Sequence, residues 1–175
     1  MNSTESSAQP TPWTWTWRDG PIEPGPCVVV DIDGVIADAV HRQHFLAGRK
    51  QWGRFFEAAG GDDLIDEVAE LLPLLRDDLA IVLLTARPES ILDTTYEWLE
   101  RHEVRWDLLI MRGFGDYAPS PMVKRAELHE LRAAGFDPRL ALDDDPRNVA
   151  MFRAEGVPCL EIPSGYHTGD ADSTT

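Results

Sequence analysis

The stretch Cys27-Val28-Val29-Val30-Asp31-Ile32-Asp33-Gly34 decides the fold. Its first half is an apolar, mostly β-branched run, which is typical of a strand buried on both faces of a parallel sheet. Two aspartates follow where this strand should end, and Gly34 permits a sharp turn directly after them. The stretch therefore predicts a buried strand that delivers two carboxylates to one edge of a sheet.

Four further apolar runs repeat this strand pattern, at residues 80–85, 108–111, 140–142 and 157–162. Helical patterns fill the gaps between them. They cover residues 65–75, 89–102, 122–134 and 146–154, with Pro or Gly marking several of the boundaries. Alternation of strands and helices with short connections predicts an α/β fold, with a mostly parallel five-stranded sheet covered on both faces.

One segment interrupts this alternation. Residues 37–61 follow the first strand without an early return to the sheet, which predicts a small helical cap inserted at that point. The segment carries four aromatic residues, Phe45, Trp52, Phe55 and Phe56. We interpret them as the core of the cap, and a base-stacking platform is the alternative.

The two ends of the chain differ from the domain between them, which we place at residues 27–166. Residues 1–26 are rich in Ser, Thr and Pro, which predicts a disordered or loosely docked tail, and residues 167–175 predict a flexible one. Trp13, Trp15 and Trp17 alternate with threonines inside the first tail, as in a short strand with one indole face. That face is expected to dock on the domain, and partner binding or self-association is the alternative.

Composition limits the class of protein. A chain of 175 residues fits one compact domain, and its net charge of −15 argues against binding an extended nucleic-acid duplex. Cys27 and Cys159 each adjoin an apolar run and are expected to be buried thiols. Neither a signal peptide nor a membrane-spanning run is recognisable, which predicts a cytoplasmic protein with no membrane partner.

Polar side chains gather where the predicted strands end. Asp31 and Asp33 follow the first strand, Thr85 and Arg87 end the second, and the run 143–145 supplies three aspartates after the fourth. Ligands of open α/β sheets bind beyond the carboxyl ends of the strands, so these groups should share one crevice. So many carboxylates repel one another unless a cation compensates, and oxygen ligands of this charge suit Mg²⁺.

These residues resemble the four motifs of the haloacid dehalogenase superfamily of phosphohydrolases. The matching segments are Asp31-Ile32-Asp33-Gly34-Val35, Leu83-Leu84-Thr85, Lys124 and Leu142-Asp143-Asp144. The resemblance extends from Cys27 to Tyr166. It implies a Rossmann-like three-layer fold and a Mg²⁺-dependent phosphatase.

A narrower resemblance, to the 3′-phosphatase domain of phage-type polynucleotide kinase-phosphatases, involves Arg42, Arg87 and the run 143–156. Arg42 stands nine residues after Asp33, where that family has a substrate-binding arginine, and Arg87 matches another arginine of the family. Two positions depart from the pattern: Asp145 replaces an arginine, and Ser120 stands where relatives often have an acid. The chain has no kinase P-loop.

The resemblance implies a role for each residue of the site. Asp31 would be the nucleophile that forms an aspartyl-phosphate, and Asp33 the general acid and base. Asp31, the main-chain carbonyl of Asp33, and Asp143 with Asp144 would hold Mg²⁺. The phosphate would bind Thr85 and Lys124, and the two arginines would bind the substrate.

Three functions follow from this sequence. The first is hydrolysis of a 3′-phosphorylated nucleotide or single-stranded polynucleotide end. The second is hydrolysis of small phosphomonoesters such as nucleotides or sugar phosphates. The third is a non-catalytic adaptor that recruits a partner through its tryptophan-bearing tail. The five histidines lack metal-ligand spacing with the cysteines and are assigned to the surface or the cap: His41, His44, His102, His129 and His167.

Overall fold

The computed structural model describes residue 12 and residues 14–167. Its central sheet has six strands in the order β1-β6-β5-β2-β7-β8. These are β1 (Trp15–Trp17), β6 (Leu108–Arg112), β5 (Ala80–Pro88), β2 (Pro26–Val30), β7 (Asp137–Asp143) and β8 (Cys159–Glu161). All neighbours are parallel except β1, which runs antiparallel to β6. The prediction of a mostly parallel α/β sheet is confirmed, and β1 adds a sixth strand to the predicted five.

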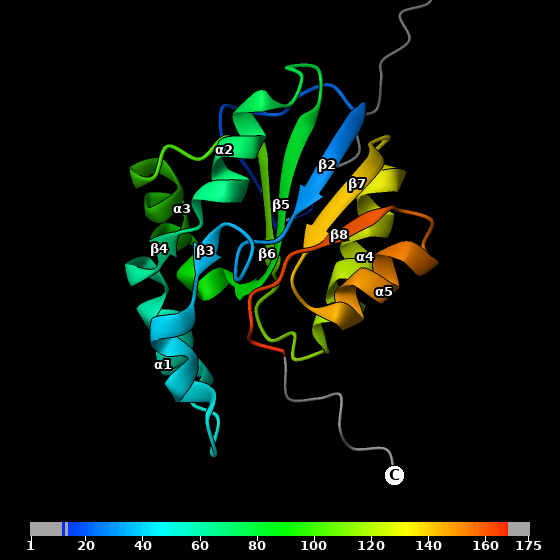
Figure 1. Cartoon of the computed structure of the whole chain (residues 1–175). Coiled ribbons are helices and arrows are strands. Elements are labelled where there is room, and N and C mark those ends of the chain that lie inside the picture. The colour runs from blue at the N-terminus through cyan, green and yellow to red at the C-terminus, as the bar shows by residue number, and fades with distance from the viewer. Residues whose placement is uncertain (1–11, 13, 168–175) are drawn as a thin grey trace, which may run out of the picture.

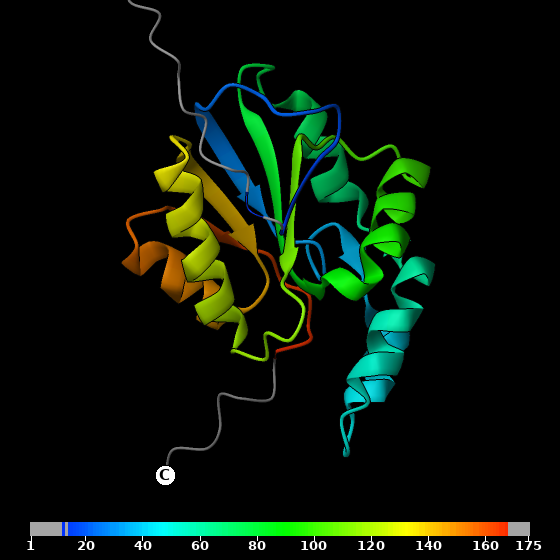
Figure 2. The ribbon, with the colours of Figure 1, turned by 180° about the vertical axis from the view of Figure 1, so that it is seen from behind.

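Helices cover both faces of this sheet (Figures 1 and 2). Helices α2 (Asp66–Leu74) and α3 (Leu92–Arg101, preceded by the 3₁₀ turn Glu89–Ile91) lie on one face, and α4 (Ser120–Ala133) and α5 (Pro146–Ala154) lie on the other. The three-layer arrangement follows from the sequence of the central strand. Val28 and Val30 point into the core beneath α2 and α3, whereas Cys27 and Val29 point into the core beneath α4 and α5.

The inserted segment forms a cap below the carboxyl edge of the sheet (Figure 1). It opens with β3 (Ala37–Asp38) and closes with β4 (Asp63–Leu64), which pair as an antiparallel ribbon. Between them lie the 3₁₀ helix Val40–Leu46, helix α1 (Trp52–Glu57) and a second 3₁₀ turn, Ala58–Gly61. This ribbon brings the two ends of the insertion together, and the helical part lies beside the carboxyl ends of the parallel strands.

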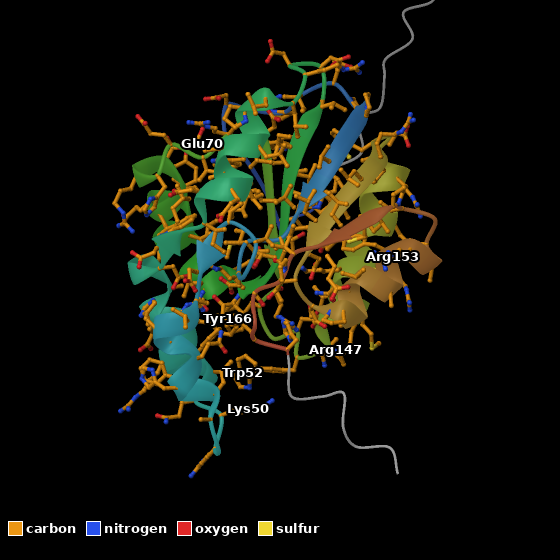
Figure 3. The ribbon with its side chains drawn as sticks, viewed as in Figure 1. Lys50, Trp52, Glu70, Arg147, Arg153 and Tyr166 are labelled. Atoms are coloured by element: carbon orange, nitrogen blue, oxygen red, sulfur yellow. The ribbon has the colours of Figure 1, made fainter. Side chains whose placement is uncertain are left out.

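The aromatic residues of the cap pack mainly on one another. Phe55 is buried, and its ring meets Phe56 and Trp52 at centroid distances of 5.4 and 5.9 Å. The guanidinium of Arg42 lies 4.2 Å from the Phe55 ring centroid. These contacts support the interpretation of the cluster as cap core, although Trp52 keeps 48% of its surface exposed near the tip of the cap (Figure 3).

The tryptophans of β1 dock on the domain itself, as expected. Trp15 is buried, its indole N–H donates to the Glu127 carboxylate at 3.1 Å, and both Trp15 and Trp17 pack against Phe136. Trp13 lies outside the described residues. The prediction of buried thiols is also confirmed, since Cys27 and Cys159 are free and buried, and burial raises their pKa values to about 12 and about 11. None of the helices in the described ranges combines the length and apolarity that crossing a membrane requires.

Candidate active site

Three aspartates from two distant segments meet at the carboxyl edge of the sheet. Asp31 directly follows β2, while Asp143 ends β7 and Asp144 follows it; the two strands are hydrogen-bonded neighbours. Each of the three offers a carboxylate oxygen within 4.8 Å of those of the other two, and all three side chains are buried. Of the five strand-end aspartates that were predicted to share a crevice, the fold thus brings these three into one cluster.

Lys124 lies between two of these carboxylates. It comes from α4, is fully buried, and its Nζ stands 2.9 Å from Asp31 Oδ2 and 2.6 Å from Asp143 Oδ2. Burial opposes its charge, but the two carboxylates outweigh burial and raise the pKa of Lys124. Lys124 is therefore a permanent cation at the bottom of the site.

The cluster still carries more negative than positive charge, because one ammonium faces three carboxylates. Burial raises the pKa of Asp31, and the neighbouring charges of Asp143 and Asp144 raise it further, against the lowering effect of Lys124. A divalent cation bound to oxygen atoms would remove this repulsion. The donor set, three carboxylates on two adjacent strand ends, fits Mg²⁺.

Gly34 makes room for this cluster. The residue has a φ of +76°, and a Cβ added to it would lie 2.1 Å from Asp144 Oδ2 and 2.9 Å from the Ser164 Cβ. A side chain here would therefore both strain the turn and displace Asp144. The tight turn after Asp33 is thus required by space as well as by backbone conformation.

Asp143 is held from two further sides. Its Oδ1 accepts hydrogen bonds from Asn148 Nδ2 and from the Asp145 backbone N–H, both at 3.0 Å. Asn148 is buried on α5, so the first turn of that helix fixes the rotamer of the carboxylate. The sequence alone does not single out Asn148; its place two residues after Pro146, which starts α5, is the available signal.

The third aspartate of the run has a different function. Asp145 is the N-cap of α5, and its Oδ1 accepts the Arg147 backbone N–H at 2.9 Å. Its carboxylate also pairs with the Arg147 guanidinium at 2.8 Å, which holds its pKa low against the opposing effect of burial. Asp145 is therefore turned away from the cluster that Asp143 and Asp144 form with Asp31.

A second group of charges lies beside the first and is built around two buried arginines. Arg42, from the cap, and Arg87, from the end of β5, both reach Asp33 Oδ1, with each Nη2 at 2.6 Å. Burial opposes ionisation of Asp33, but Arg87 and Arg42 outweigh it and hold the pKa of Asp33 below its usual value. The side chain of Asp33 thus faces the arginines and not the carboxylate cluster of Asp31, Asp143 and Asp144.

Asp62 completes this group, although no sequence pattern singles it out. This buried cap residue accepts from Arg42 Nε and Nη2 at 2.7 and 2.6 Å and from Arg87 Nη2 at 2.8 Å. His41 Nε2 lies 2.8 Å from the same carboxylate. The signal that could have found Asp62 was the need of two predicted substrate arginines for a nearby counter-charge.

Arg87 also offers an unused donor. Among the described residues, its buried Nη1 has no hydrogen-bond partner. Its backbone N–H donates to Thr85 Oγ1 at 3.2 Å, and Thr85 is buried at the same strand end. A buried guanidinium N–H without a partner is costly, and a ligand oxygen is the natural acceptor.

The C-terminal segment closes one side of the site. The Tyr166 side chain lies beside the cap (Figure 3), and its hydroxyl donates to Asp38. His167 Nε2 lies 3.3 Å from Asp144 Oδ2. The hydrogen bond to Asp144 raises the pKa of His167. A cavity of about 400 Å³ lies beside Gly34, between this segment and the start of α2. The sequence predicts a surface or cap position for His167, whereas the structure places its ring against Asp144 of the acidic cluster.

A protein-family model matches this arrangement over most of the chain. The model of the polynucleotide kinase PNKP phosphatase domain aligns with residues 25–167, which include every site residue described above. Among curated proteins, no sequence matches the chain.

Solved structures show the same fold. A chain of the Pnkp1/Rnl/Hen1 RNA repair complex is 25% identical, with a TM-score of 0.67 over 90% of this chain and 46% of that one. The class C acid phosphatase from Bacillus anthracis is 16% identical, with a TM-score of 0.58 over 83% of this chain and 69% of that one. A haloacid dehalogenase-like hydrolase from Streptococcus pneumoniae is 14% identical, with a TM-score of 0.54 over 77% and 83%. The present chain thus spans about half of the protein in the repair complex.

Proposed function

Because the chain belongs to the family of the polynucleotide kinase PNKP phosphatase domain, within the haloacid dehalogenase superfamily, we propose that it hydrolyses 3′-phosphorylated ends of nucleotides or polynucleotides with the help of Mg²⁺. One observation carries this proposal. The buried carboxylate cluster of Asp31, with Lys124 bound to it, lies beside two buried arginines that share Asp33. This arrangement supports a site in which Asp31 serves as nucleophile, Lys124 as a cation and the two arginines as the anion-binding pair.

In the proposed reaction, each step is assigned to a residue of this site. Asp31 attacks phosphorus, so that a new oxygen–phosphorus bond forms as the ester bond breaks, and Asp33 gives its proton to the departing alkoxide. Water then attacks the aspartyl-phosphate, Asp33 takes a proton from it, and Asp31 is regenerated with release of phosphate. Lys124 and Thr85 stabilise the phosphoryl oxygens. A bound Mg²⁺, held by Asp31, the Asp33 main-chain carbonyl, Asp143 and Asp144, would offset the charge of nucleophile and phosphate.

Asp33 must be protonated to act as an acid, yet the arginines favour its ionised form. A phosphate dianion in the site would oppose this effect, because its negative charge beside Asp33 raises the pKa of that carboxyl. Arg87 Nη1, which lacks a protein partner, is a donor available to the same phosphate. Substrate binding would therefore prepare the general acid.

The charge of the protein limits the form of the substrate. A net charge of −15 disfavours the long-range attraction of a duplex, whereas a single 3′-phosphate needs only the buried cations Arg42, Arg87 and Lys124. The likeness to a chain of an RNA repair complex supports a polynucleotide end over a metabolite.

Product analysis with a substrate panel tests the proposal. The purified chain with Mg²⁺ is expected to release phosphate from a 3′-phosphorylated single-stranded oligonucleotide with a higher kcat/KM than from the 5′-phosphorylated isomer, sugar phosphates or p-nitrophenyl phosphate. Asp31→Asn should abolish every one of these activities, since the amide cannot attack. A flat profile across the panel would instead identify a general small-molecule phosphatase, and an active Asp31→Asn would remove Asp31 as nucleophile.

The adaptor alternative is less well supported. Trp15 and Trp17 pack on Phe136 of their own domain and are not available as a free binding segment. The acidic cluster and its lysine are complete, as catalysis requires.

A further inference from the structure

Two aromatic side chains stand almost fully exposed in the loop between β6 and α4. Phe114 keeps 85% and Tyr117 94% of its surface in contact with solvent. Met122, on the first turn of α4, is exposed as well. A single exposed apolar residue needs no explanation, but three of them within nine residues of chain single out this loop as a candidate binding surface.

The loop that presents the two rings is rigidly built. The Asp116 N–H donates to the Gly113 carbonyl at 3.1 Å, and Gly115 has a φ of +76°, which closes a turn with Phe114 at its apex. The Ala118 N–H then donates to Asp116 Oδ1 at 2.8 Å, which places Tyr117 at the centre of an Asx turn. Both rings therefore project from fixed hydrogen-bonded turns, and binding a ligand on them would order little additional backbone.

Hydrogen bonds connect this loop to the end of β5, which carries Thr85 and Arg87. Arg112 Nε donates to the Ala86 carbonyl at 3.0 Å, and Ala86 lies between Thr85 and Arg87. The same guanidinium holds the loop through the Ala118 carbonyl at 2.6 Å and the Asp116 carbonyl at 3.3 Å.

The far end of the loop also leads into the site. It runs directly into α4, the helix that carries Lys124, and lies at the same edge of the sheet as the cap and the C-terminal segment (Figure 2). The loop that carries the two aromatic residues thus forms part of the rim around the proposed phosphate site.

Electrostatics explain why such a rim would need aromatic rings. A chain of net charge −15 gains little from neutralising phosphates along a nucleic-acid backbone. Stacking of bases on aromatic side chains is the other general source of affinity for single strands, and it is indifferent to base sequence.

We infer that Phe114 and Tyr117 form a stacking platform for the nucleobases of the single-stranded 3′ end whose terminal phosphate enters the site. The inference rests on the proposed function and adds the means by which the polynucleotide is recognised. In this proposal the buried cations bind the terminal phosphate, and Phe114 and Tyr117 bind the bases.

A kinetic comparison tests the platform. The variants are Phe114→Ala, Tyr117→Ala and their double, with Leu74→Ala as control, because Leu74 is 81% exposed but lies on α2, away from this edge. The substrates are p-nitrophenyl phosphate, a 3′-phosphorylated oligodeoxynucleotide, and the same oligodeoxynucleotide with abasic residues in place of its last two nucleosides. Circular dichroism checks that each variant is folded.

The double variant is expected to lose roughly tenfold or more in kcat/KM on the ordinary oligonucleotide, mostly through KM. It should match the wild type on p-nitrophenyl phosphate and on the abasic substrate, since neither carries a nucleobase in the two positions next to its phosphate. Leu74→Ala should behave as wild type throughout.

Two other results overturn the inference and can be told apart. If the wild type prefers the oligonucleotide but the aromatic variants keep that preference, the platform is wrong while the proposed function stands. If the wild type hydrolyses p-nitrophenyl phosphate but shows no preference for the oligonucleotide, the proposed substrate is wrong and the platform is rejected with it.

Discussion

Arg42 and Asp62 form a bidentate ion pair that is shielded from solvent, with Nε 2.7 Å from Oδ1 and Nη2 2.6 Å from Oδ2. Asp62 also holds Arg87, and the Trp98 indole donates to the Asp62 carbonyl at 2.8 Å. The cap and the sheet domain are thus joined by a charge cluster that also sets the position of Asp33.

We expect Asp62→Asn to weaken both stability and catalysis. It leaves two buried guanidiniums with a single carboxylate partner, and breaking a buried pair in this way costs about 3–5 kcal/mol. Displaced arginines would lower kcat/KM by about a hundredfold on the folded enzyme. Urea denaturation and steady-state kinetics measure the two effects. Asp63→Asn, an exposed neighbour, is the control, and an Asp62→Asn variant that resembles it would contradict this role.

The lowered pKa of Asp33 predicts a dependence of stability on pH. A carboxyl whose pKa is lower in the folded than in the unfolded chain stabilises the fold above the unfolded value, ordinarily 3.8 for this residue. That contribution disappears as the pH falls through the folded value, because the unfolded chain binds the proton first. The free energy of unfolding should therefore fall less steeply with acid in Asp33→Asn.

Urea denaturation at a series of pH values from neutral into the acid range checks this prediction for Asp33. Asp78→Asn is a matched control, because Asp78 pairs with Arg76 at 2.9 Å on the exposed surface. Ion pairs on the surface contribute little to stability, so Asp78→Asn should leave the pH dependence of the free energy of unfolding unchanged. If the free energy of unfolding depends on pH in the same way in wild type and Asp33→Asn, the buried contacts of Asp33 with the two arginines are refuted.

Much of the site was predictable because strand ends are predictable. Apolar runs located β2, β5 and β7, and parallel strands bring their carboxyl ends together, so the meeting of Asp31 with Asp143 followed from topology. Lys124 came from the family resemblance, and its position at 2.6 Å from Asp143 Oδ2 agrees with it.

The rest depended on tertiary contacts that leave no periodic signal. Asp62 and Asp63 are consecutive acids in a loop-like stretch, yet one is buried and the other exposed. Which of them turns inward is decided by Arg42 and Arg87, and no pattern in the chain records that choice. Likewise, β1 is too short to stand alone and forms because the edge of β6 is open to pair with it.

The run 143–145 predicts a sharp difference between neighbouring acids. Asp144→Ala should remove most activity at ordinary Mg²⁺ concentrations, because Asp144 belongs to the carboxylate cluster. Asp145→Ala should retain activity but lose about 1 kcal/mol of stability, as expected for loss of a helix N-cap. Activity against Mg²⁺ concentration and thermal denaturation separate the two effects. Equal loss of activity in both variants would mean that Asp145 also serves the metal site.

Gly34→Ala tests the space around Asp144. The added Cβ would overlap the Asp144 carboxylate and would also sit at a positive φ. We expect the Mg²⁺ concentration for half-maximal activity to rise by about 10–100-fold, in the range seen when the support of a metal ligand is lost. Gly115→Ala is the control, because Gly115 also has a φ of +76° but has open space around it. Similar metal titrations for the two variants would attribute the effect to backbone strain alone.

Lys124→Met should lower kcat by about 10²–10³-fold at saturating Mg²⁺, the range for loss of one stabilising group at a developing charge. The substitution should also change the pH profile. Lys124 lowers the pKa of Asp31 against burial and two neighbouring carboxylates, so its removal raises that pKa and leaves less of the nucleophile ionised. The acid limb of the profile should therefore move to higher pH. Lys50→Met, on the cap, should leave both rate and profile as in wild type. A slower Lys124→Met with an unshifted acid limb would confine Lys124 to the phosphoryl group and contradict its effect on Asp31.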